Sequence, residues 1–280
     1  MGGLKNYGND PTKLATLAQP WGNSHYEIWG EGPPLLLLNG LGFSRWSWQW
    51  QRALGLRCLV WEHRGFGGSD PGERDFSLAE LADDALALLD HLQIERTVVF
   101  GVSMGGMVAQ EFALRHPHRC AGLVLGCTWC GGPETVKMTP EVQQRMTEVA
   151  EKNWSLEALR EVLDLSFSPG WIESQPQQVE SYLSLRLQHQ SRDFLSWSRQ
   201  RKASLRFDSS QRLAEFRGPS MLLHGGDDQV VPLDNLGVLC QRLPQAQTYV
   251  FAEARHLFWI EAARPLQPLL ESFTHRCSPG

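Results

Sequence analysis

A serine between two glycines carries the clearest chemical signal in this sequence. Ser103 is the centre of a Gly-x-Ser-x-Gly motif at residues 101–105, which follows the apolar run 98–100 and precedes a helical pattern. A strand, a sharp turn and a helix are the context in which this motif acts as a nucleophile elbow. Because the strand and the helix nearly touch at such a turn, Gly101 and Gly105 must lack side chains. The pattern predicts a nucleophilic Ser103; the alternative is a tight connection without chemistry.

A serine hydroxyl is a poor nucleophile at neutral pH and needs a base that takes its proton. Of the nine histidines, His256 lies in a loop between the last predicted strand and a closing helix. His63 and His224 lie near other strand ends and are the competing candidates. The order serine, acid, histidine along the chain favours His256 as the base.

The base in turn needs a carboxylate that orients it. Asp227 and Asp228 both follow the predicted strand 220–224. Asp228 is favoured because it stands further around the turn, closer to Pro232. Asp227 is the alternative candidate for this carboxylate. If it does not have that role, it is interpreted as a solvated turn residue or as one that caps main-chain N–H groups.

Acyl transfer also requires two N–H groups that stabilise the oxyanion of a tetrahedral intermediate. One is expected from the residue after the nucleophile, Met104, and the other from the loop after an early strand, at Leu41. That loop follows the wholly apolar run 34–38 and contains two glycines. Gly40 and Phe43 of the same loop are expected to contact substrate, together with Trp129, which follows another predicted strand.

The elements that would position these residues alternate along the chain. Helices are expected from the capping box at Ser77, after the elbow as far as Pro117, over residues 233–243, and at the end to about residue 273. Residues 46–50 hold three tryptophans, interpreted as surface helix packing with room for one pocket residue. This alternation predicts an α/β fold with a mainly parallel sheet and helices on both faces. Short apolar runs predict strands at residues 26–29, 34–38, 57–61, 98–102, 122–127, 220–224 and 248–251, of which the first is expected at an edge of the sheet.

The alternation breaks between the strands at 122–127 and 220–224. Residues 139–209 are polar and helical in pattern, and they carry six large aromatic side chains. We expect a helical cap at residues 131–209, inserted into a core of residues 1–130 and 210–280, over the sheet edge where such folds bind ligands. So many aromatic residues suggest a lid with an apolar underside; the alternative is a set of extra packing helices. The six are Trp154, Phe167, Trp171, Tyr182, Phe194 and Trp197.

Composition and charge narrow the class of protein. Hydrophobic content of 42% and charged content of 20% are typical of a soluble globular protein, and a net charge of −5 argues against nucleic acid or an anionic membrane as partner. Residues 1–20 lack the pattern of a signal peptide, so we expect a cytoplasmic monomer or homodimer with reduced cysteines. The Cys127–Cys130 pair lacks the second pair of a zinc site or a redox context. No metal or cofactor is expected.

These motifs together resemble the α/β-hydrolase superfamily in its single-domain form with a helical cap. The resemblance extends from Tyr26 to Phe273. Two positions depart from the common pattern: Asn39-Gly40 stands where many relatives have His-Gly, and Glu62-His63 where many have an aspartate before Arg-Gly. Neither change removes a catalytic group. The segments that carry the resemblance are 38–42, 62–70, 101–106 and 225–232, and Arg255-His256 with Glu261.

The resemblance implies a serine hydrolase that cleaves a small ester, lactone or thioester with an apolar part, through an acyl-enzyme and a Ser103–Asp228–His256 triad. Among members, the cap region is most similar to bacterial esterases and lactonases such as 3-oxoadipate enol-lactonase. Hydrolysis of a carbon–carbon bond and perhydrolase activity use the same triad and are alternatives. A non-catalytic ligand-binding protein is the alternative from another class. A serine at position 103 argues against haloalkane dehalogenase and epoxide hydrolase chemistry, which use a carboxylate nucleophile.

Overall fold

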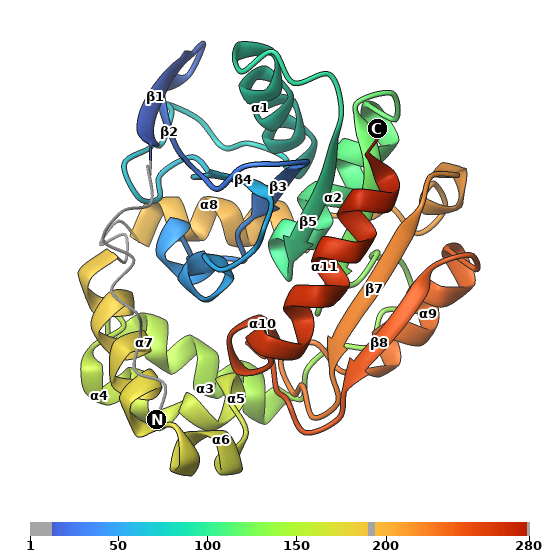
Figure 1. The fold of residues 1–280 in the computed structure, drawn as a ribbon. Coiled ribbons are helices and arrows are strands. Elements are labelled where there is room, and N and C mark those ends of the chain that lie inside the picture. The colour runs from blue at the N-terminus through green and yellow to red at the C-terminus, as the bar shows by residue number, and fades with distance from the viewer. Residues whose placement is uncertain (1–12, 190–193, 279–280) are drawn as a thin grey trace.

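The computed structural model describes residues 13–189 and 194–278, and its strands form one sheet in the order β1-β2-β4-β3-β5-β6-β7-β8 (Figure 1). The first two strands are antiparallel to their neighbours, and all pairings from β4 to β8 are parallel. This confirms the predicted α/β class with a mainly parallel sheet. The strands are β1 (Lys13–Gln19), β2 (Gly22–Trp29), β3 (Pro34–Leu38), β4 (Arg57–Trp61), β5 (Thr97–Val102), β6 (Cys120–Gly126), β7 (Ser220–Gly225) and β8 (Gln247–Phe251).

The central strands are apolar throughout because helices cover both faces of the sheet. In β3, Leu35 and Leu37 enter one core cluster, whereas Leu36 and Leu38 enter the other. The first cluster contains the apolar side of the closing helix α11, and the second contains those of α1, α2 and α9. This two-sided burial is what the predicted wholly apolar strands require.

The helices of the sheet region begin and end where local signals place them. At the start of α1, Glu80 N–H donates to Ser77 Oγ (3.2 Å) and Ser77 N–H donates to Glu80 Oε2 (2.9 Å), which is the predicted capping box. Helix α2 ends at Arg115, before Pro117. The helices outside the long insertion are α1 (Leu78–His91), α2 (Met104–Arg115), α9 (Asp234–Arg242), α10 (Phe258–Glu261) and α11 (Ala263–Cys277).

Within the described residues, six α-helices lie between β6 and β7, and most of them gather at one end of the molecule (Figure 1). Their aromatic residues Trp154, Phe167 and Tyr182 are buried in the same cluster as Trp46 and Trp259, so the insertion shares its core with the sheet region. These helices are α3 (Pro140–Glu151), α4 (Leu156–Glu161), α5 (Leu163–Ser166), α6 (Pro169–Ser174), α7 (Pro176–His189) and α8 (Phe194–Leu205).

Two expectations about the amino-terminal third are wrong. Residues 26–29 do not form an edge strand, because β1 pairs with β2 along its whole length and takes the edge. Trp46 and Trp48 do not lie on a surface helix: both are buried in a short 3₁₀ helix, Arg45–Gln51, and the Trp48 ring packs edge-on against Phe100 at 5.2 Å. The helix lies between the sheet and the insertion, with Trp48 against Phe100 and Trp46 against Tyr182 on α7, so it is buried on more than one side.

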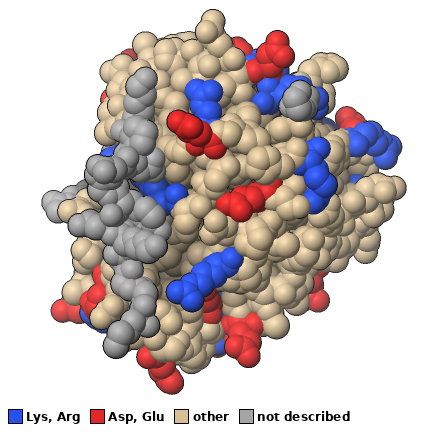
Figure 2. Space-filling model, viewed as in Figure 1, with Lys and Arg blue, Asp and Glu red and all other residues tan. Residues whose placement is uncertain are grey.

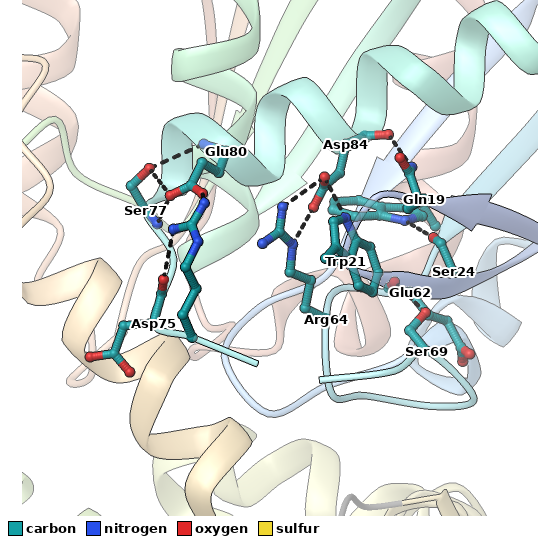
Figure 3. A network of polar contacts seen from close by, with 12 residues as sticks. Gln19, Trp21, Ser24, Glu62, Arg64, Ser69, Asp75, Ser77, Glu80 and Asp84 are labelled. Atoms are coloured by element: carbon teal, nitrogen blue, oxygen red, sulfur yellow. Dashed lines mark hydrogen bonds and ion pairs between the residues drawn. The ribbon is translucent and has the colours of Figure 1, made fainter. Parts of the chain in front are cut away.

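A buried ion pair fixes the long loop between β4 and α1 (Figure 3). Arg64 Nε donates to Asp84 Oδ2 at 2.6 Å, and Trp21 Nε1 donates to Asp84 Oδ1 at 2.7 Å. Gln19 adds a hydrogen bond to the Asp84 carbonyl at 3.2 Å. Burial raises the pKa of the Asp84 carboxyl, although Arg64 and Trp21 oppose this shift. The pair therefore ties β1, the loop and α1 together.

On the face shown in Figure 2, charged side chains of both signs are scattered among uncharged ones. Lysine and arginine do not gather there into a basic patch of the kind that binds nucleic acid. Among the described residues, we find no helix whose length and apolar character would let it cross a membrane.

Candidate active site

The turn between β5 and α2 holds Ser103 in a strained conformation. Its backbone angles are φ 53° and ψ −121°, in a region that non-glycine residues rarely adopt. A Cβ atom at Gly101 would lie 2.0 Å from the Gly105 carbonyl oxygen, and one at Gly105 would lie 2.2 Å from the Leu38 oxygen. The predicted reason for the two glycines is therefore confirmed: strand and helix touch at this point.

Strand β6 holds the Ser103 main chain from the side. Ser103 N–H donates to the Gly126 carbonyl at 2.9 Å, and its own carbonyl accepts from Thr128 Oγ1 at 2.7 Å. These two bonds fix the turn despite its strained angles, because both main-chain polar groups of Ser103 are satisfied.

His256 and Asp228 form a hydrogen-bonded pair. The His256 Nδ1 to Asp228 Oδ2 distance is 2.8 Å, and the aspartate side chain is completely buried. Asp228 Oδ1 accepts from the N–H groups of Val230 and Val231 at 2.8 and 2.9 Å. Asp227 is instead half exposed and pairs with Arg255 at 2.8 Å. Of the two candidate acids, the structure places Asp228 against His256.

The two competing histidines are enclosed in the protein. His63 is completely buried, and burial lowers its pKa to about 3. In the part of the chain that the structure describes, neither of its ring nitrogens has a hydrogen-bond partner. His224 is also buried, its Nδ1 lies 3.0 Å from the Gly225 carbonyl oxygen, and burial lowers its pKa. Neither ring is open to a substrate, whereas that of His256 is partly accessible.

Cys127 lies beside the pair, which the sequence did not indicate. Its thiol, an Asp228 oxygen and a His256 nitrogen all lie within 4.8 Å of one another. Burial and the Asp228 charge raise the pKa of the thiol well above its ordinary value. A metal would need the thiolate, and Asp228 is already committed to three hydrogen bonds, so we interpret this group as a hydrogen-bonded cluster.

Contacts with the inserted helices fix the loop that carries His256. Arg255 N–H donates to Glu261 Oε2 at 3.1 Å, and the same carboxylate accepts from Ser168 N–H at 3.3 Å. Leu257 N–H donates to the Ser166 carbonyl at 3.0 Å. Both serines belong to the insertion, so the position of His256 depends on how those helices pack.

The loop after β3 passes next to Ser103. A Cβ atom at Gly40 would lie 3.5 Å from Ser103 Cβ. Phe43 N–H is bound to the Gly40 carbonyl (3.1 Å), and Gly42 N–H is bound to Gln200 Oε1 on α8 (3.1 Å). Leu41 lies between these tethered residues. On the other side, the Met104 N–H belongs to the first turn of α2, where intrahelical partners are absent.

Asn39, which stands where many relatives have histidine, anchors this loop. Its side chain is buried; Nδ2 donates to the Trp61 carbonyl at 3.0 Å and Oδ1 accepts from Ser47 Oγ at 3.2 Å. The amide thus links the ends of β3 and β4.

The predicted substrate-contact residues lie on two sides of the site. Phe43 stacks on Trp46 at 5.4 Å and meets the edge of Trp259 at 6.2 Å, and Trp259 lies 6.5 Å from the His256 ring. Trp129 packs against the other core cluster, and its carbonyl accepts from Gln110 Nε2 at 2.9 Å.

Comparisons with known proteins identify the family and the fold of this chain. The sequence profile of the family described as alpha/beta hydrolase fold matches residues 33–263. The chain is 29% identical over 247 residues to a poly(3-hydroxyalkanoate) depolymerase from Ectopseudomonas oleovorans, covering 86% of this chain and 83% of the relative.

Two further relatives extend the comparison. A 2-hydroxy-6-oxononadienedioate/2-hydroxy-6-oxononatrienedioate hydrolase from Paraburkholderia phymatum is 30% identical over 262 residues, 88% of this chain and 89% of that protein. The crystal structure of the enol-lactonase from Burkholderia xenovorans superposes with a TM-score of 0.77 at 25% identity, covering 93% of this chain and all of the other. The expected resemblance to enol-lactonases is confirmed.

Proposed function

The chain belongs to the alpha/beta hydrolase fold family, and from this membership we propose that it is a cofactor-free serine hydrolase of carboxylic esters, lactones or thioesters. The observation that carries the proposal is the 2.8 Å hydrogen bond between His256 and the buried Asp228. It orients a partly accessible imidazole, to which the strained turn between β5 and α2 would present Ser103. Serine, orienting acid and base in this arrangement are the parts that acyl transfer needs.

The hydrogen bonds of Asp228 define the protonation state required of His256. Because the aspartate accepts at both oxygens, Nδ1 of the imidazole must carry the proton, and Nε2 is left to accept one. In the proposed reaction, Nε2 takes the Ser103 proton as Oγ attacks the carbonyl. The N–H groups of Leu41 and Met104 stabilise the oxyanion. His256 then protonates the leaving alkoxide and activates water, which releases the acyl group.

We propose that residues 131–209 act as a cap over a core of residues 1–130 and 210–280. Support comes from the cap's contacts with the two loops that would carry the base and the oxyanion donor, through Ser166 and Gln200. The shared aromatic cluster suits a small substrate with an apolar part, which Gly40, Phe43 and Trp129 would contact. The protein would work as a monomer or a homodimer.

Carbon–carbon bond hydrolysis is the second candidate, and the relative from Paraburkholderia phymatum favours it. That enzyme is named for a dienedioate or trienedioate substrate, and the same serine, aspartate and histidine could serve both reactions. The two functions differ in the substrate consumed, so parallel assays on esters and on vinylogous diketones distinguish them.

The cysteines support a cytoplasmic location for this protein. All six are free thiols, and four of them are buried. Proteins that work in oxidising compartments more often pair their cysteines. Cell fractionation would test the location.

The proposed mechanism is tested with p-nitrophenyl esters, from acetate to long-chain acyl groups. We expect Ser103→Ala to lower turnover about 10³-fold or more and to abolish labelling by a fluorophosphonate. Asp228→Asn should cost about 10⁴-fold, because the imidazole then adopts the wrong tautomer. Asp227→Asn is the matched control; this half-exposed neighbour pairs with Arg255, and its loss should change turnover little. Equal effects of the two aspartate variants would contradict the proposed roles.

A further inference from the structure

Gln200 on α8 is a buried amide with a hydrogen-bond partner at only one of its two polar atoms. Its side chain is completely buried, on the helix face that also buries Ser196 and Ala203. Oε1 accepts a hydrogen bond from Gly42 N–H at 3.1 Å, whereas Nε2 has no partner within the described residues. An unpaired buried donor costs at least as much free energy as a single hydrogen bond contributes. Stability alone therefore does not explain a glutamine at this position.

The bond to Gln200 holds the central peptide of a β-turn. Phe43 N–H donates to the Gly40 carbonyl at 3.1 Å, which closes a turn over residues 40–43. Gly42 has a φ of 79° less 4°, that is 75°, and Leu41 does not have a positive φ, so the turn is of type II. In a type I turn the peptide between these two residues would be flipped, with φ at the second of them changed by about 170°. Gln200 accepts the N–H of this peptide and thereby favours the type II orientation.

The same turn approaches the proposed nucleophile. A Cβ atom at Gly40 would lie 3.5 Å from Ser103 Cβ. The next residue is Leu41, whose N–H is the proposed oxyanion donor, and the peptide that follows it is the one bound by Gln200. A flip of that peptide changes ψ at Leu41 and so moves the turn relative to Ser103. Because an oxyanion donor must lie about 2.7–3.1 Å from its acceptor, such a movement weakens stabilisation of the transition state.

We propose that Gln200 is a positioning residue for the proposed reaction. It acts through Gly42, by holding the turn in the conformation that directs Leu41 N–H toward the oxyanion formed on Ser103. This inference rests on the proposed hydrolase function and assigns part of its transition-state stabilisation to α8 of the insertion. The Gly42 carbonyl is bound separately, by Arg186 Nη1 at 2.6 Å, so the loop keeps one tether when Gln200 is replaced.

The first test measures steady-state hydrolysis of a p-nitrophenyl ester by two variants of Gln200. Gln200→Met keeps the length of the side chain but lacks the acceptor, so kcat should fall about 10- to 100-fold while KM stays within about twofold. Gln200→Glu keeps an oxygen acceptor and should retain most of the turnover. A trifluoromethyl ketone adds to a serine as a hemiketal oxyanion, so its affinity for Gln200→Met should fall by about the factor lost in kcat/KM.

Gln178→Met is the matched control. Gln178 on α7 also accepts a hydrogen bond from the sheet region, from Trp50 Nε1 at 2.9 Å. Its loss should leave kcat within about twofold of wild type. If both methionine variants lower kcat equally, or if Gln200→Met raises only KM, the Gln200 bond merely packs the insertion and the proposal is wrong. Gln200→Leu, which also lacks an acceptor, replaces the methionine variant in every comparison if that variant does not fold.

Hydrogen exchange of the Gly42 amide, followed by NMR, separates this proposal from the proposed reaction because it needs no substrate. Exchange should be about tenfold faster in Gln200→Met than in wild type, and close to wild type in Gln200→Glu and Gln178→Met. If exchange responds in this way but no ester is cleaved and a fluorophosphonate does not label Ser103, the tether stands and the hydrolase function fails. If esters are cleaved and Gln200→Met changes neither exchange nor kcat, the hydrolase function stands and the proposal fails.

Discussion

His63 should make the stability of this protein depend on pH, and replacing it by leucine should remove that dependence. Its ring is completely buried beside Trp61, with the ring centroids 4.8 Å apart. Burial lowers its pKa from the ordinary 6.5 to about 3, with no other cause. Between these two values the unfolded chain binds a proton that the folded protein excludes. Stability is therefore complete above pH 6.5 and is lost as the pH falls toward 3.

The linkage relation gives the size of the effect. Across this window, the free energy of unfolding falls by about 1.4 kcal/mol per pH unit for one such group. At pH 5, the contribution of His63 should be about 2 kcal/mol lower than at pH 8. In the His63→Leu variant this loss should be absent. The apolar side chain also removes two unpaired ring nitrogens, so the variant should be no less stable at pH 8.

Urea unfolding of wild type and His63→Leu at pH 8 and pH 5 measures the difference directly. Other groups titrate in both proteins, so the effect of His63 is the change, between pH 8 and pH 5, in the difference between their free energies of unfolding. If that difference stays constant within roughly 0.5 kcal/mol, which is about the limit of such comparisons, the reasoning is refuted. Esterase activity at pH 8 should persist in the variant, because the proposed base is His256; its loss in a folded protein would contradict that assignment.

Two matched pairs of residues and one further glycine give additional predictions. Gly105→Ala should abolish soluble folded protein, because its Cβ would overlap the Leu38 carbonyl, whereas Gly170→Ala, where a Cβ meets nothing within 4 Å, should express normally. Asp84→Asn should lower stability in thermal unfolding by about 3–5 kcal/mol by leaving a buried arginine unpaired. Asp83→Asn breaks an exposed pair and should cost under about 1 kcal/mol. Gly237→Ala, at an exposed position of helix α9, should stabilise by about 0.5–1 kcal/mol in the same assay.

Local patterns were sufficient for most of the fold. The apolar runs of β3 to β7 and the capping box at Ser77 are visible in residues close in sequence. The glycines around Ser103 are visible as a short motif, although Gly105 is required by the distant Leu38 carbonyl. Strand β1 could not be predicted from such patterns. It is an edge strand held by main-chain hydrogen bonds to β2, and its side chains are largely exposed or half-exposed. Without a buried face it has no apolar signature.

The candidate site could likewise be predicted only in part. The motif and the chain order indicate Ser103 and His256, but only the fold shows that Asp228, and not the adjacent Asp227, lies against the imidazole. The sequence shows Cys127 only as half of a Cys-x-x-Cys pair. Its position beside His256 depends on how β6 and β7 pack, which no local pattern reports.

Residues far away in the sequence hold the loop after β3, which is the proposed source of an oxyanion donor. Gln200 and Arg186 bind Gly42 from 158 and 144 positions away, whereas Gly126 and Thr128 of the sheet region hold the Ser103 main chain. In the proposed mechanism, stabilisation of the transition state therefore depends on the inserted helices as well as on the sheet region. A change on α7 or α8 that displaces the Gly42 loop should lower kcat even where the Ser103 turn stays the same.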